Sequence, residues 1–131
     1  MEQSKNVQGV KLTASEWSAL TCLWERSPQT VMQLVAELDS RVGWAKSTTI
    51  TTLRRMEEKG LVAVEQGERG KLYRPAVERE QAAAVETQSF LDRVYQGSVG
   101  LMMSAMAKRQ ELSADEVAQL RAILDEIGEG K

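Results

Sequence analysis

A chain of 131 residues is long enough for two small folded units, and its 42% hydrophobic and 27% charged residues are typical of a globular protein. With no histidine and one cysteine, it cannot form an internal disulfide, a Cys/His zinc cluster or a histidine-dependent catalytic site. We therefore expect no enzyme activity, no metal and no cofactor. No run approaches the roughly 20 apolar residues of a membrane span, and the first residues do not resemble a signal peptide, which predicts a cytoplasmic protein without membrane insertion.

The formal net charge of −2 is unevenly distributed along the chain. Residues 41–74 hold eight basic and four acidic side chains, a surplus of four positive charges, which leaves the remainder with a net charge of −6. Only charges close to a duplex neutralise its phosphates. A basic middle between acidic ends is therefore compatible with a local nucleic-acid surface, although a solvated face of mixed charge has the same composition.

Two helices are predicted near the N-terminus, each beginning at a capping box. Thr13 and Glu16 form the first box, and the apolar side chains that follow at helical spacing predict a helix over 14–26. A second box begins at Thr30 and starts a helix that runs to about residue 40.

A third helix is predicted over residues 44–60, ending at a glycine. Thr49, Leu53 and Met56 recur on one face at about 100° per residue and should be buried. The residues on the opposite face are Ser47, Ile50, Thr51 and Arg54. Threonine is a poor helix former, so a surface selected only for helix stability would prefer Glu, Lys or Ala. This face is therefore a candidate binding surface.

The three tryptophans and the cysteine are expected to be structural. Trp17 and Trp24 lie on the apolar face of the first helix, and Cys22 lies between them on the same helix. Trp44, just before the third helix, could pack inside or cover a sugar-phosphate, and we expect packing.

Two short β-type runs follow, at residues 61–66 and 71–75, joined by the glycine-flanked turn GERG. Three helices followed by a hairpin give the order of a winged helix-turn-helix, in which the third helix enters the major groove and the hairpin touches the backbone. Arg69 and Lys71 flank Gly70 at the tip, where we expect phosphate contacts. A soluble turn without a ligand is the alternative.

After the hairpin, helices are predicted over about 77–96, 99–109 and 113 onward. They show no obvious small core of their own, which indicates burial against a second subunit. The predicted fold class is mainly α with a small β-hairpin wing: a winged helix-turn-helix DNA-binding domain at 1–75 and a C-terminal helical dimerisation domain at 76–131.

Apolar side chains of the C-terminal region are expected at the subunit interface. They are Phe90, Leu91, Val94, Leu101, Met102, Met106, Leu120 and Leu124. Methionines suit an adaptable dimer surface, and a metal-thioether site is the alternative for them.

The segments LTASEWSALTCLW, STTITTLRRMEEKGLV and GKLYRP, together with a C-terminal FLxxxY…LSxxE…LRxIL pattern, resemble the penicillinase repressor family (BlaI/MecI/CopY type) over nearly the whole chain. The resemblance implies a DNA-binding transcriptional repressor. It also implies a homodimer on palindromic operators with TACA/TGTA-like half-sites, and control of β-lactam-resistance or metal-homeostasis genes. The positions that match the family's recognition helix are Ser47, Thr48, Ile50, Thr51, Arg54 and Arg55.

Each residue type of this helix suits one kind of DNA contact. Hydroxyls can bond phosphates or base edges, the methyls of Ile50 and Thr51 can meet thymine methyls, Arg54 can read guanine, and Arg55, further to the side, can meet phosphate. Solvated helix charges are the alternative for the arginines. The complete DNA-binding set we expect is Lys46, Ser47, Thr48, Ile50, Thr51, Arg54, Arg55, Arg69 and Lys71.

Three departures from the family pattern concern its inducing signal and its choice of DNA bases. The C-terminal LDEIGEGK lacks the cysteine-rich motif of the copper-responsive branch, which excludes copper sensing through that motif. Ile50 stands where described β-lactamase repressors carry an arginine, so the base preference is open. A membrane sensor metalloprotease induces the β-lactam branch through cleavage between Asn and Phe, and the aligned pair here is Ala105-Met106.

A protein-binding module and an enzyme are the alternative functions. A winged-helix module that binds protein would carry acidic or apolar residues on the outer face of its third helix, whereas this face is rich in threonine and arginine. An enzyme would need a carboxylate site that no motif of the sequence indicates.

Overall fold

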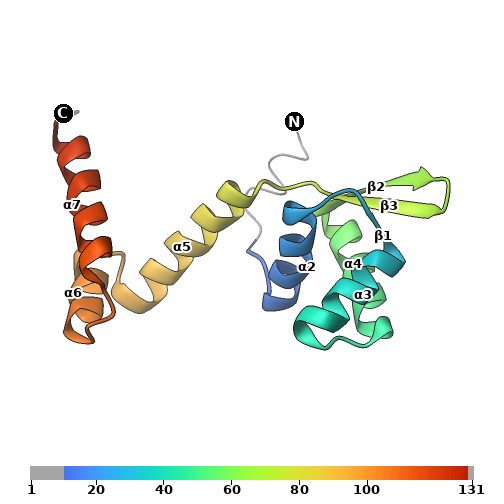
Figure 1. Ribbon diagram of the computed structural model, residues 1–131, viewed down its shortest axis with the longest axis horizontal. Helices are drawn as coiled ribbons and strands as arrows, with labels where there is room; N and C mark the ends of the chain where they lie inside the picture. Colours follow the sequence, from blue (N-terminus) through green and yellow to red (C-terminus); the bar gives the residue numbers. More distant parts are fainter. Residues whose placement is uncertain (1–10, 130–131) are drawn as a thin grey trace. The chain divides into compact units, whose positions relative to one another are not determined.

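The computed structural model describes residues 11–129, in which six helices and three short strands follow one another (Figure 1). The chain divides into two compact units, Met1–Thr87 and Gln88–Lys131, which we call the head and the tail. Helix α5, Arg79–Tyr95, begins in the head and ends in the tail.

Helices α2 (Ala14–Glu25) and α3 (Val31–Val42) begin at the two predicted capping boxes. In each box the threonine hydroxyl accepts a hydrogen bond from the amide three residues later, and that residue's side chain accepts one from the threonine amide. These reciprocal bonds satisfy amides that the first turn of a helix otherwise leaves without partners, which explains why both helices start here.

Helix α4, Lys46–Lys59, ends at Gly60. This glycine has a φ of 81°, in the left-handed region that a side chain disfavours, and its amide bonds back to carbonyls of the last turn. The chain can therefore leave α4 directly into the sheet. The predicted bounds of α2, α3 and α4 agree with the structure to within two residues at each end.

The sheet is antiparallel, with the strand order β1-β3-β2. Strands β2 (Val62–Gly67) and β3 (Gly70–Pro75) form the predicted hairpin, which extends past the helices of the head (Figure 1). Strand β1 (Gln29–Thr30), which pairs with β3, was not predicted. Two residues are too few to show the alternation by which a strand is recognised.

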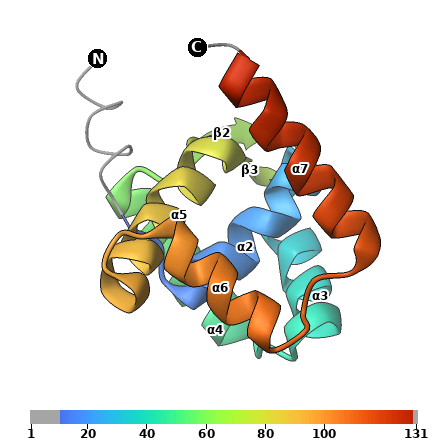
Figure 2. The same cartoon turned by 90° about the vertical axis from the view of Figure 1, so that its left-hand side faces the viewer.

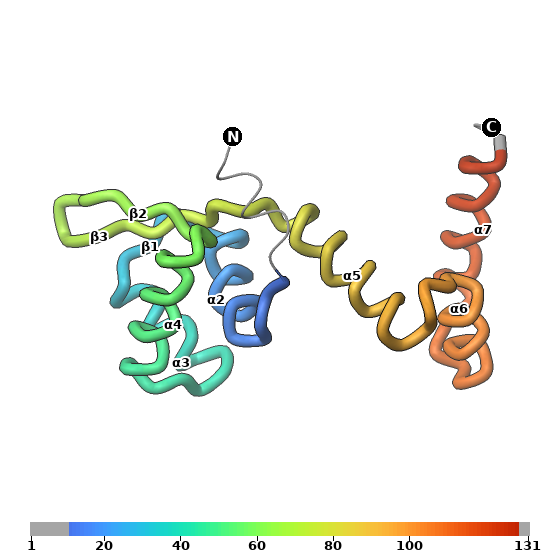
Figure 3. The backbone as a smooth tube through the Cα atoms, turned by 180° about the vertical axis from the view of Figure 1, so that it is seen from behind, coloured from blue at the N-terminus to red at the C-terminus, as the bar shows by residue number. Residues whose placement is uncertain are grey.

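The core of the head forms where α2, α3 and α4 meet on one side of this sheet (Figure 3). Leu20, Leu34 and Leu53, one from each helix, are at most 1% exposed. The three tryptophans pack against this cluster, as predicted. Cys22 is fully buried among it, and burial raises the pKa of its thiol to about 11, so the thiol is a packing group.

The tail contains the end of α5 and the helices α6 (Val99–Lys108) and α7 (Ala114–Glu129), which a short loop joins (Figure 2). Ser98 caps α6, and Ser113 forms a capping box with Glu116 at the start of α7. The tail helices pack little against one another. The apolar faces of these helices therefore have few partners within one chain.

The division between head and tail falls inside α5. Val77 and Ala82 are 6% and 4% exposed and belong to the core of the head. The residues after Pro75 thus begin as part of the head, and the head extends further along the chain than the predicted winged-helix segment.

Candidate nucleic-acid interface

Helix α4 presents one buried and one exposed face. Thr49, Leu53 and Met56 are at most 1% exposed, as the helical spacing predicts. The exposed members of the predicted DNA-binding set on this helix are Lys46, Ser47, Thr48, Arg54 and Arg55. Ile50 and Thr51 are half-buried. The structure therefore brings all seven predicted positions of α4 to its solvent side or its flank.

The N-terminus of α4 differs from those of α2 and α3 because Ala45 caps it without a side-chain hydrogen bond. The amides of Lys46 and Ser47 therefore have no side-chain acceptor from the cap. Amides at a helix N-terminus point outward and, with the helix dipole, favour an anionic partner.

The hairpin turn consists of Glu68 and Arg69, because Gly67 pairs with Gly70 across it. Gly70 has a φ of 119°, which favours glycine, and a Cβ built on it would meet nothing within 4 Å. Its backbone is therefore open to a close approach, between the exposed side chains of Arg69 and Lys71. The same residues and the first turn of α3 line a pocket of about 460 Å³.

Ion pairing separates the eight basic residues of 41–74 into two groups. Arg41 pairs with Glu25 and Glu37, Lys59 pairs with the buried Glu16, and Arg74 pairs with Glu65. The other five form no ion pair within residues 11–129: Lys46, Arg54, Arg55, Arg69 and Lys71. These five are the basic residues of the predicted DNA-binding set, and their charges are free to meet an external anion.

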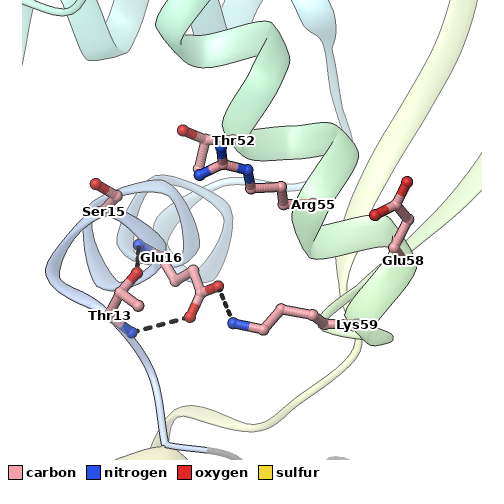
Figure 4. Close-up of a pocket in the computed structure, with 7 residues that line it drawn as sticks. All are labelled: Thr13, Ser15, Glu16, Thr52, Arg55, Glu58 and Lys59. Carbon is pink, nitrogen blue, oxygen red and sulfur yellow. Dashed lines mark hydrogen bonds and ion pairs between the residues drawn. The ribbon is translucent and has the colours of Figure 1, made fainter.

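Arg55 lies at the side of this surface. Figure 4 shows it with Thr52 on the side of α4 that faces the first turn of α2, where they line a pocket of about 530 Å³ together with Ser15. At the same pocket Lys59 bonds Glu16, which joins the end of α4 to the start of α2 (Figure 4). The position of Arg55 suits a backbone phosphate better than a base edge.

Glu58 is a feature of α4 that sequence reasoning missed. It is exposed and follows Arg54 by four residues and Thr51 by seven, so it lies on the same helix face. A carboxylate repels phosphate, so the candidate surface ends before Glu58, in the last turn of α4. The helical spacing alone could have shown this limit.

The predicted dimerisation residues of the tail differ in exposure. Phe90, Val94, Leu101 and Leu124 are 39%, 43%, 51% and 64% exposed. Met102, Met106 and Leu120 are half-buried. Leu91 is 6% exposed within its own chain and has little surface left for a partner. Three further exposed side chains that were not predicted are Val99, Ile123 and Ile127.

No helix described between residues 11 and 129 is long and apolar enough to cross a membrane. Over the same residues, no group of three or more Cys, Asp or Glu side chains is arranged to hold a metal ion.

A three-helix head with an antiparallel hairpin, whose third helix exposes a basic and hydroxyl-rich face, defines a winged helix-turn-helix of the transcription-regulator class. Comparison with known families is more specific. The penicillinase repressor model matches residues 12–126, and the chain belongs to that family. It is accordingly a DNA-binding transcriptional repressor and not an enzyme.

Two curated relatives illustrate the family. The chain is 22% identical over 115 residues to the methicillin resistance regulatory protein MecI of Staphylococcus aureus (strain N315), covering 88% of this chain and 94% of that protein. It is 26% identical over 116 residues to the penicillinase repressor of Bacillus licheniformis, covering 88% and 91%. Among solved structures, a MarR family protein from Bacillus stearothermophilus matches 98% of this chain and 81% of its own, with 19% identity and a TM-score of 0.48.

Proposed function

We propose that this chain represses transcription as a homodimer that binds a palindromic operator with TACA/TGTA-like half-sites. In each copy, α4 lies in the major groove and the tip of the β2-β3 hairpin contacts the backbone. The regulated genes are proposed to serve β-lactam resistance or a related stress response, on the basis of the named roles of MecI and the penicillinase repressor.

The observation that carries the proposal is the division of the basic residues by ion pairing. The three that pair with carboxylates lie outside the predicted surface, whereas the five without such partners lie on α4 and at the hairpin tip. A charge already neutralised within the protein gains little from phosphate, while a free charge releases a counterion when it binds. This division supports DNA as the partner of the α4 face.

Individual contacts follow from the position of each side chain. Arg54 is proposed to bond a guanine, and Ile50 and Thr51 to contact thymine methyls. Lys46, Ser47, Thr48 and Arg55 are proposed to bond phosphates or base edges near the start and side of α4.

The homodimer is supported by the tail. Its exposed large apolar side chains gather on helices that pack little against one another, so a second copy of the tail would remove them from water. Two reading heads on one dimer match two half-sites about 34 Å apart.

Proteolytic induction by a membrane sensor metalloprotease is less well supported. The aligned pair Ala105-Met106 lies inside α6, and both side chains are half-buried. Proteases cut preferentially at exposed loops, so cleavage would first require α6 to unwind. We therefore propose repression without assigning this pair as the point of induction.

Fluorescence anisotropy with a labelled dyad from the protein's own promoter tests the proposal. The logarithm of the association constant should fall with the logarithm of salt concentration with a slope of several units. Arg54→Ala should weaken binding to the dyad about 5- to 150-fold and weaken binding to random duplex much less.

Arg26→Ala is the matched control, because it removes an equal charge from a head side chain that pairs with Glu37 at 3.8 Å. It should leave dyad affinity within about twofold of the wild type. A salt-independent affinity, or equal losses for Arg54→Ala on dyad and random DNA, would contradict the proposal.

A further inference from the structure

Three contacts hold the start of α5 and the residues before it on the head, and two of them involve Trp24. The indole Nε1 of Trp24 donates a hydrogen bond to the carbonyl of Val77 at 2.9 Å. The guanidinium of Arg79 lies over the same indole, 5.7 Å from the ring centroid. The amide of Ala76 donates to the carbonyl of Leu61 at 2.9 Å. The segment that precedes α5 is therefore held by the head and cannot swing as a free linker.

Burial reinforces these contacts. Val77 and Ala82 are 6% and 4% exposed and belong to the core of the head. The ring of Trp24 is itself held edge-to-face against Trp17, with centroids 5.4 Å apart. The charge of Arg79 also contributes, after that of Arg41, to a lowered pKa of Glu25. The contact that Arg79 makes is with the indole of Trp24, and its charge also acts on Glu25 without forming an ion pair.

None of the side chains in these contacts belongs to the predicted DNA-binding set on α4 and the hairpin. The contacts are therefore not expected to bind DNA themselves. They act on α5, which continues from the head into the tail. A dimer that places two heads on one duplex binds strongly only when the connection allows both heads to engage at once. A shift of one base pair moves a half-site by about 3.4 Å and turns it by about 35° around the duplex.

We propose that Trp24, Val77 and Arg79 form a clamp that fixes the direction in which α5 leaves the head, and so sets the half-site spacing that the dimer accepts. Trp24 and Arg79 are then positioning residues for operator selection. The proposal rests on the dimeric operator binding proposed above.

Two variants of the 131-residue chain test the clamp. Trp24→Phe keeps an aromatic ring but removes the N–H donor, and Arg79→Ala removes an exposed side chain whose loss leaves the core intact. Anisotropy is measured with a duplex that holds one TACA/TGTA-like half-site and with dyads whose spacing varies in single base-pair steps around about one helical turn.

Both variants should bind the single half-site within about twofold of the wild type, because the α4 surface is unchanged. On the best dyad they should bind about tenfold more weakly, and their preference between spacings should fall to about threefold or less. Arg93→Ala is the control, since it removes a charge from α5 outside the clamp, and it should keep the wild-type spacing profile.

Three results would overturn the clamp. A wild-type spacing preference in both variants means that the exit of α5 is set elsewhere. Equal losses on half-site and dyads mean that Trp24 and Arg79 only stabilise the head. If the wild type itself binds a dyad no more tightly than a half-site, the proposed dimeric function fails and the clamp fails with it.

Discussion

The head and the tail differ in how far their apolar side chains are buried. Of the fifteen buried hydrophobic residues in the described part of the chain, fourteen lie in the head, whereas seven of the nine exposed large hydrophobic residues lie in the tail. The head therefore closes its core within one chain. The tail does not, because its helices have too few contacts with one another to cover their apolar faces. A second copy completes the tail in the proposed dimer, so the two regions should respond differently to substitution and to protein concentration.

The largest effect is expected in the core of the head. Leu20→Ala removes a fully buried side chain of α2 and should lower the free energy of unfolding by about 2–5 kcal/mol. Urea denaturation followed by tryptophan fluorescence measures this loss, which should be the same at low and high protein concentration. A loss below about 1 kcal/mol, or one that disappears at high concentration, would contradict a core closed within one chain.

A smaller effect, of a different kind, is expected in the tail. Leu124 is 64% exposed in one chain, so Leu124→Asp should leave the head folded while placing a charge at the proposed subunit interface. The dimer dissociation constant should rise at least about 30-fold, or about 2 kcal/mol, by sedimentation equilibrium. Gln119→Ala, an exposed polar position on the same helix, is the control. An unchanged dimer in Leu124→Asp would place the interface elsewhere.

The sequence predicted the head in more detail than the tail because the signals of the head are local. Two capping boxes and Gly60 mark the starts and the end of helices within a few residues. The ion pair of Glu16 with Lys59 joins residues 43 apart in the chain, and no local pattern indicates it. The basic residues that the sequence assigns to the surface are exposed in the structure, but the sequence alone did not show which of the cations are unpaired.

In the tail, helical periodicity predicted the positions of α5, α6 and α7. It did not predict which of their apolar side chains are buried. Leu91 and Val94 both lie on the apolar side of α5, yet the first is 6% and the second 43% exposed. Their difference within one chain depends on which side chains pack against each, and helical spacing does not give these contacts. A single sequence does not contain this information.

Two arginines of the β2-β3 hairpin should contribute differently to DNA binding. Arg69 has no ion pair within the described residues, while Arg74 pairs with Glu65 at 3.6 Å. Arg69→Ala should therefore reduce the slope of log affinity against log salt by about 1, whereas Arg74→Ala should leave it nearly unchanged. Anisotropy titrations at several salt concentrations measure both slopes. Equal reductions in the two variants would show that ion pairing does not decide which cations meet phosphate.

The smallest effect is expected at the exposed ion pair that joins α2 to α3. The hydrogen bond from Arg41, followed by the charges of Arg41 and Arg79, lowers the pKa of the Glu25 carboxyl below its ordinary 4.5. Because the folded state holds the ionised form, this stabilisation is present above about pH 4.5 and is lost as the pH falls through the lowered pKa.

Glu25→Gln should accordingly lower the melting temperature slightly at pH 6, and the difference from the wild type should vanish as the pH falls below the lowered pKa of Glu25. Differential scanning calorimetry across this range measures it. In an Arg41→Met background the pH dependence caused by the same substitution should be smaller, because the hydrogen bond and charge of Arg41 are absent and only the charge of Arg79 remains. A difference that grew as the pH fell would contradict the sign of the shift. A difference of undiminished size without Arg41 would assign the lowered pKa of Glu25 mainly to Arg79, and would thus link this carboxylate to the proposed clamp.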